Sequence, residues 1–199
     1  MNVQPNPWED NIPGSYPDMD YLLSEAARSR YVIAAHYMRD CPIVVEIGGF
    51  KTPITAYLTH TPERVLMVDP IVQAYHSNEL RGARCRVDHV RGRFQDHDFE
   101  LPRGDYGFVC LGVSLKHFGE EPARRAEGWS KWLRLVDQSR VAVLEYALDW
   151  ALGSELARRT VAESNTRVIV QMDLDMSMSP GMDTAHSRRR LLVLRPEHA

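Results

Sequence analysis

IVVEIGGFKTPITAYLTHTPERVLMVDP, residues 43–70, contains a strand pattern, a glycine turn, a helix start and a second strand pattern. The first five residues are apolar apart from Glu46 and mostly β-branched, which is typical of a parallel strand buried on both faces. Gly48 and Gly49 end this run. Because glycine reaches backbone angles closed to other residues, a pair here favours a turn with a ligand lying against the main chain.

The residues after the glycines complete one strand-helix-strand unit. Thr52 offers an N-cap hydroxyl, and Pro53 suits the first helical position, where its missing N–H costs nothing. Arg64 to Val68 then form a second apolar run, which Asp69 ends. In such units a ligand binds beyond the carboxyl ends of the strands, and an acid about 20 residues after the glycine turn holds ribose hydroxyls.

Three residues of this unit carry a resemblance to a known family. Glu46, Gly48 and Asp69 match an acid, any residue, then glycines, followed by an acid at the end of the second strand. In this respect the chain resembles the class I S-adenosylmethionine-dependent methyltransferases. It departs from them at Phe50 and Thr52, where the second and third glycines are usual. The dinucleotide pattern G-x-G-x-x-G also fails, which argues against NAD and FAD, and a bare turn without a nucleotide is the alternative.

The resemblance implies an α/β, Rossmann-like fold with a seven-stranded mixed sheet of order 3-2-1-4-5-7-6 and helices on both faces. The last two strand patterns, Thr166 to Leu174 and Arg189 to Leu194, are joined without a helix, as in the antiparallel end of that sheet. Further strands are expected at 84–90, 107–113 and 140–145, and helices at 18–39, 53–60, 71–80, 120–136 and 148–164. One domain is expected over 1–199, with an N-terminal arm and lid helix at 1–40 and a core at 41–195.

The same resemblance implies where S-adenosylmethionine would bind. The glycines and the helix start at Thr52 would meet its amino-acid end, and Asp69 would bind its ribose. Phe94 or Asp96 would flank the adenine, because Arg93 stands where the family often has an acid. The expected cofactor-binding residues are Glu46, Gly48, Gly49, Phe50, Thr52, Asp69, Phe94 and Asp96.

Candidate catalytic residues follow the fourth and fifth strand patterns. His117 comes just after 107–113, where a side chain would face the transferable methyl group and could take a proton from the acceptor. Glu145 ends the next pattern and is a second candidate base. The plainer alternatives are a loop histidine bonded to backbone and an acid that caps a loop. The expected substrate-binding residues, each with core or surface packing as its alternative, are Tyr16, Tyr21, Arg30, Tyr31 and Tyr146.

Composition limits the classes of protein and partner. A net charge of −3 argues against a nucleic-acid partner, since such proteins usually carry a basic balance or stripe. No apolar run approaches the ~18 residues of a membrane span. The start of the chain lacks a secretory signal, and three scattered cysteines suit a reducing compartment, so a cytoplasmic location is expected. The acids and histidines of 88–98 alternate along a strand and a loop, so no metal is expected.

These patterns together predict an enzyme that transfers a methyl group from S-adenosylmethionine to the O or N of a small molecule. A small acceptor is favoured because about 40 residues before the first strand and short loops elsewhere leave little material to grip a macromolecule. A non-catalytic binding or regulatory relative is one alternative, supported by the departures at Phe50, Thr52 and Arg93. Transfer of another group of the same cofactor, such as aminocarboxypropyl, is a second.

Overall fold

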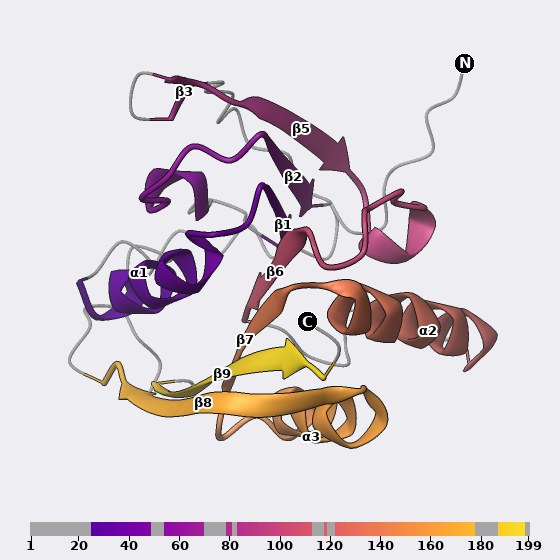
Figure 1. Cartoon of the computed structure of the whole chain (residues 1–199). Helices are drawn as coiled ribbons and strands as arrows, with labels where there is room; N and C mark the ends of the chain where they lie inside the picture. Colours follow the sequence, from indigo (N-terminus) through magenta and orange to yellow (C-terminus); the bar gives the residue numbers. More distant parts are fainter. Residues whose placement is uncertain are drawn as a thin grey trace, which may run out of the picture.

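One mixed sheet organises the structure. A computed structural model of the chain describes residues 25–48, 54–69, 79–80, 83–112, 118, 122–177 and 187–197. The sheet has seven strands in the order β5-β2-β1-β6-β7-β9-β8, and β3 and β4 form a separate two-stranded sheet (Figure 1). Counted along the main sheet alone, the order is 3-2-1-4-5-7-6, which confirms the expected topology.

The elements have the following bounds. The strands are β1 (Ile43–Ile47), β2 (Arg64–Asp69), β3 (Glu79–Leu80), β4 (Ala83–Arg84), β5 (Arg86–Arg91), β6 (Tyr106–Leu111), β7 (Val141–Ala147), β8 (Thr166–Asp175) and β9 (Arg188–Pro196). The helices are α1 (Glu25–Met38), α2 (Pro122–Gln138) and α3 (Ala151–Glu163), with 3₁₀ turns η2 (Ile54–Ala56) and η3 (Phe94–Asp96).

Two expected helices differ from the structure. Between β1 and β2 the described residues contain only the turn η2, because Ile54 and Leu58 are already buried in the core and the chain must return to β2. The helix expected at 71–80 is wrong at its end, where β3 pairs antiparallel with β4. Only Arg81-Gly82 separate these strands in the sequence, and two-residue connections containing glycine favour hairpins. Residues 70–78 lie outside the described residues.

The hairpin at the end of the chain reverses the sheet. β1 pairs parallel with β2 and β6, β2 with β5, and β6 with β7. β9 runs antiparallel to both β7 and β8, between which it lies. This confirms the antiparallel pairing expected for Thr166 to Leu174 and Arg189 to Leu194.

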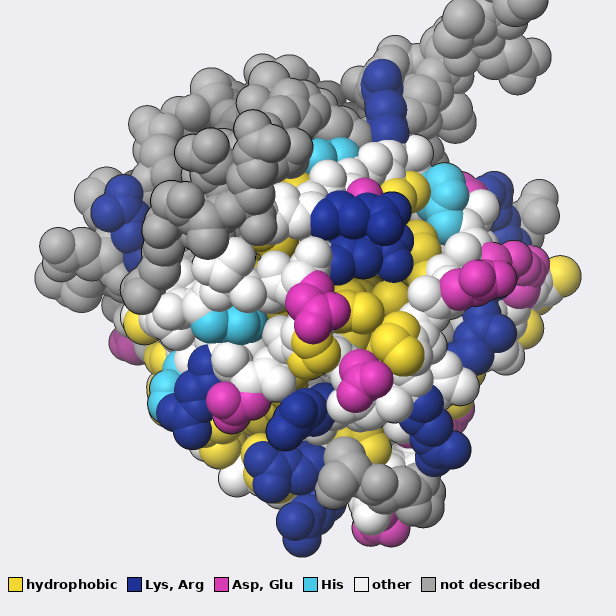
Figure 2. Space-filling view, turned by 45° about the horizontal axis from the view of Figure 1, so that its top comes forward, with side chains coloured by type: hydrophobic (Ala, Val, Ile, Leu, Met, Phe, Trp, Pro, Cys, Tyr) yellow, Lys and Arg dark blue, Asp and Glu magenta, His cyan; other side chains and the backbone are white. Residues whose placement is uncertain are grey.

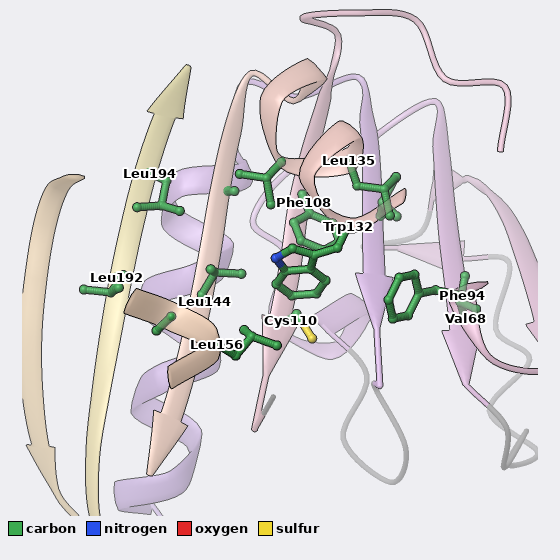
Figure 3. Close-up of a cluster of buried hydrophobic side chains, with 14 of the residues drawn as sticks. Val68, Phe94, Phe108, Cys110, Trp132, Leu135, Leu144, Leu156, Leu192 and Leu194 are labelled. Carbon is green, nitrogen blue, oxygen red and sulfur yellow. The ribbon is translucent and has the colours of Figure 1, made fainter. Parts of the chain in front are cut away.

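Two apolar clusters fill the space between the sheet and its helices. α1 covers one face, and α2 and α3 cover the other (Figure 1). Figure 3 shows the cluster on the face covered by α2 and α3, with Trp132 of α2 at its centre, between Phe108 of β6 and Phe94 of η3. Its indole N–H donates to the hydroxyl of Thr160 in α3 at 2.9 Å, so this large buried side chain leaves no unpaired donor.

The carboxyl ends of the parallel strands are tied together by backbone hydrogen bonds. Gly48, just after β1, donates its N–H to Val68 of β2 at 2.9 Å, and Gly112, just after β6, donates to Glu145 of β7 at 2.8 Å. Both glycines have φ of +80°, which residues with a side chain rarely adopt. The chain therefore turns away sharply after β1 and β6, and one edge of the sheet gathers the carboxyl ends of the five parallel strands.

Candidate functional site at the carboxyl edge of the sheet

Glu46 anchors the turn that follows β1. Its side chain is 2% exposed and lies on the α1 face of the sheet. The backbone N–H of Ile54 donates to both carboxylate oxygens, at 3.1 and 2.9 Å. Burial, together with the nearby charge of Asp69, raises the pKa of Glu46 to about 8, although the Ile54 hydrogen bond opposes this rise. Glu46 therefore joins the end of β1 to the start of η2 from within the fold.

Glu46→Gln is expected to flatten the dependence of stability on pH. The unfolded carboxyl ionises near its ordinary pKa of 4.5, whereas the folded one keeps its proton to about pH 8. The folded state thus binds more protons between these values, so the free energy of unfolding of the wild type falls as pH rises through this range, by about 4 kcal/mol. Glutamine cannot ionise, so the variant should lose this component.

Urea denaturation of both proteins at pH 5 and pH 8.5 measures the effect. Glu100→Gln, at an exposed position between η3 and β6, is the control and should follow the wild type. If the free energy of unfolding changed by the same amount between pH 5 and pH 8.5 in the wild type and in Glu46→Gln, Glu46 would be ionised in the folded protein across the whole range.

Asp69 and Gly48 lie next to each other in this edge. Asp69 is the last residue of β2, is half-buried, and shares the α1 face with Glu46 because strand residues alternate. Among the described residues, no atom lies within 4 Å of a Cβ added to Gly48, so those residues leave the space beside its main chain open. The arrangement offers an exposed backbone beside a carboxylate, which is what a ligand bearing hydroxyls requires.

Glu145 is enclosed by two arginines. It is fully buried in β7 and accepts hydrogen bonds from Arg30 of α1 at 3.1 Å and from Arg189 of β9 at 2.9 Å, with a further bond from the Arg189 Nε. Burial alone would raise its pKa, but the charges and hydrogen bonds of Arg189 and Arg30 outweigh burial and hold the pKa below its usual range. A carboxylate so paired is a poor proton acceptor. The geometry supports a structural role rather than the base expected from the sequence.

Arg30 and Tyr31 attach α1 to the sheet. Both are buried, at 3% and 4% exposed, and the Arg30 guanidinium lies 4.9 Å from the Tyr31 ring centre. The Tyr31 ring stacks on Tyr57 at 5.1 Å. Tyr146 points to the opposite face from Glu145, into the cluster beneath α2 and α3, where burial raises its pKa. The structure therefore gathers Arg30 and Tyr31 around Glu145 and leaves Tyr146 apart from them.

Phe94 and Asp96 have other partners than an adenine. Phe94 is 4% exposed and lies at 5.3 Å from the Phe118 ring and 5.9 Å from the Trp132 ring, inside the core (Figure 3). The Asp96 carboxylate is 2.6 Å from an Arg124 nitrogen of α2. In the described structure, the flat face of Phe94 is therefore a core surface, and Asp96 is an exposed ion-pair partner of α2.

The structure bears on the remaining expectations as follows. Residues Tyr16, Tyr21, Gly49, Phe50, Thr52 and His117 lie outside the described residues. Within the described ranges, no three His, Cys, Asp or Glu side chains gather to hold a metal ion, and Asp88 pairs with Arg64 at 2.6 Å instead. No described helix is long and apolar enough to cross a membrane.

Arg189 is the residue that reasoning from the sequence missed. A signal for it existed, because an acid in a strand buried on both faces needs a cationic partner. The register of the hairpin, which sets Arg189 opposite Ala147, was needed to choose it among three consecutive arginines.

Comparisons with known proteins bear on this fold. No protein-family profile matches the chain, and no curated protein matches it by sequence. The N-methyltransferase NodS from Bradyrhizobium japonicum WM9, crystallised with S-adenosyl-L-homocysteine, is similar at a TM-score of 0.63 and 12% identity, over 98% of this chain and 94% of that one. A Burkholderia thailandensis 1,6-didemethyltoxoflavin-N1-methyltransferase was crystallised with 1,6-didemethyltoxoflavin and S-adenosylhomocysteine bound. It is similar at a TM-score of 0.60 and 15% identity, over 86% of this chain and 78% of that one. The 23S rRNA methyltransferase ErmE is similar at a TM-score of 0.50 and 13% identity, over 85% of this chain and 68% of that one.

These likenesses agree with the strand order. The chain has the Rossmann-like fold of the class I S-adenosylmethionine-dependent methyltransferases.

Proposed function

We propose that the protein is an enzyme that binds S-adenosylmethionine and transfers its methyl group to the O or N of a small molecule. The observation that carries the proposal is the group formed by Glu46, Gly48 and Asp69 on one face of the carboxyl edge. A buried acid holds the turn after β1, an open glycine backbone follows it, and a carboxylate ends the neighbouring strand. Two structural neighbours, NodS and the toxoflavin enzyme, were crystallised with the demethylated form of this cofactor.

The residues present fit the cofactor in distinct ways. Gly48 would receive its amino-acid end against the main chain, because no atom of the described residues lies within 4 Å of a Cβ added there. Asp69 would accept hydrogen bonds from its ribose hydroxyls. Glu46 is a positioning residue, since its carboxylate is occupied by Ile54. The chemistry that S-adenosylmethionine supplies when bound is an electrophilic methyl group, and the chain's task is to align the acceptor with it.

A small acceptor is favoured over RNA. ErmE is named as a methyltransferase of 23S rRNA, whereas the toxoflavin enzyme was crystallised with a small molecule bound. On the face shown in Figure 2, basic and acidic side chains are interspersed across the described surface, and the chain as a whole carries −3. Binding to the phosphate backbone of RNA requires a basic surface, because displaced counterions supply most of the affinity.

Asp69→Ala is expected to weaken S-adenosylmethionine binding about tenfold to a hundredfold, since a carboxylate bonded to neutral hydroxyls contributes roughly 1.5 to 3 kcal/mol. Isothermal titration calorimetry on both proteins gives the affinities, and circular dichroism checks that the variant is folded. Asp105→Ala is the matched control, because Asp105 precedes β6 at the opposite edge of the sheet and is exposed.

Two results would count against the proposal. Equal affinities of wild type and Asp69→Ala would remove Asp69 from the site. Failure of the wild type to bind the cofactor at all would favour the non-catalytic alternative, which the departures at Phe50 and Thr52 suggest. The masses of reaction products separate methyl transfer from transfer of an aminocarboxypropyl group.

A further inference from the structure

A cavity opens at the opposite edge of the sheet from the candidate site. It has a volume of about 300 Å³ and lies between the last turn of α1, the residues just before β1 and β7, and the end of β9. Its lining residues are His36, Tyr37, Arg39, Asp40, Cys41, Arg140, Val141 and Arg195. Since the parallel strands begin here, it is separated from the carboxyl-edge site by the length of the strands. We refer to it as the arginine cavity.

Positive charge exceeds negative charge in the arginine cavity. Three guanidinium groups line it, against the single carboxylate of Asp40. Arg39 pairs loosely with that carboxylate at 3.4 Å, and both side chains are more than half exposed. Arg140 donates to the backbone carbonyl of Asp40 at 3.1 Å, a contact that carries no neutralising charge. The lining therefore keeps a net positive charge.

Arg195 is the residue that the fold itself does not explain. Arg39 and Arg140 lie by the carboxyl end of α1, where cations are favourable next to the helix dipole. Arg195 stands on β9, directly opposite Arg167 of β8. Like charges facing each other across neighbouring strands destabilise a sheet, and among the described residues Arg195 has no ion-pair partner. An anion bound beside Arg195 in the arginine cavity would reduce the repulsion between Arg195 and Arg167.

We propose that the arginine cavity binds a small molecule through a phosphate group. Guanidinium forks match phosphate oxygens in pairs, and such charge-assisted hydrogen bonds are about twice as strong as neutral ones. Three arginines from three separate segments can share the oxygens of a tetrahedral phosphate, whereas a carboxylate offers only two oxygens. The volume lies at the lower end of the range for small-molecule sites, roughly 300 to 1,000 Å³.

The test uses the full-length protein and inorganic pyrophosphate, titrated by calorimetry. The wild type should bind it, and Arg195→Ala and Arg140→Ala should each weaken binding about tenfold or more, the loss expected for a hydrogen bond between charged groups. Arg134→Ala removes an exposed arginine of α2, outside the cavity, and should leave the affinity unchanged. Because Arg195 is exposed and faces Arg167, its variant should be no less thermally stable than the wild type.

Three outcomes would overturn the inference. The wild type could fail to bind pyrophosphate, the cavity variants could bind as tightly as Arg134→Ala, or citrate could bind as tightly as pyrophosphate. The last result would show attraction of any polyanion rather than recognition of phosphate. Binding of S-adenosylmethionine is measured separately, so failure here would leave the proposed function standing.

Discussion

Glu145→Ala is expected to lower the free energy of unfolding by about 3 to 5 kcal/mol, because breaking a buried ion pair from one side leaves charge buried without compensation. Here two guanidinium groups, of Arg30 and Arg189, would be left 3% and 8% exposed without their carboxylate. The pKa of Glu145 lies below its usual range, so its carboxylate is charged at neutral pH. Urea denaturation at pH 7 measures the loss.

The matched control for this experiment is Glu155→Ala. Glu155 also pairs with an arginine, Arg158 at 2.8 Å, but on the exposed surface of α3, where such pairs contribute little. Equal losses for Glu145→Ala and Glu155→Ala would show that the buried group contributes no more than a surface pair. Replacing Arg30, Glu145 and Arg189 together by apolar residues of similar size should recover most of the lost stability.

The arrangement of these three residues also explains how α1 is held. Arg30 comes from a helix near the start of the described chain, whereas Glu145 and Arg189 come from β7 and from the last strand. One carboxylate thus fixes α1 over the part of the sheet where the strands change from parallel to antiparallel. Specific pairing of this kind selects one placement of the helix, which nonspecific apolar contact alone does not.

The strand order could be predicted because each step has a local cause. Apolar runs separated by helical patterns give parallel strands, and the final pair without a helix must return antiparallel. Pro122 indicates the first turn of the helix expected at 120–136, since a missing N–H costs nothing there, and α2 spans Pro122–Gln138. The turn after Gly48 could also be predicted, since its φ of +80° is what the glycine permits.

The surroundings of the predicted site residues depend on contacts between distant parts of the chain, and the residues next to them in the sequence do not indicate those contacts. Phe94 follows a glycine and an arginine in a polar stretch, so its burial against Trp132 of α2 is a tertiary contact that the neighbouring residues do not signal. Glu145 looked available because strand ends at this edge usually face a ligand. Its two arginine partners come from opposite ends of the chain, and only the assembled sheet brings them to one carboxylate.

His117→Ala is expected to lower turnover by roughly 10² to 10⁴ while leaving the affinity for S-adenosylmethionine nearly unchanged, if His117 takes the acceptor's proton. His117 lies outside the described residues, so this prediction rests on its position in the chain. β6 ends at Leu111, and Gly112 turns the chain there with its N–H bonded to Glu145 of β7. The described end of β6 lies at the carboxyl edge, next to the end of β1. With Glu145 held by two arginines, His117 is the remaining candidate base of the two that the sequence suggested.

Steady-state kinetics with a methyl acceptor, together with calorimetry on the cofactor, separates the possible roles of His117. His97→Ala serves as the control, because His97 lies in the loop between η3 and β6 beside Phe99 and is not proposed to act on the acceptor. A small loss of turnover would mean that aligning the acceptor suffices, as an in-line displacement allows. If His117→Ala lost cofactor affinity or stability in proportion to activity, the histidine would be a structural loop residue. If His117 is the proton acceptor, its replacement should instead lower turnover alone. The loss should shrink as pH rises, because the acceptor hydroxyl or protonated amine then loses its proton to solvent.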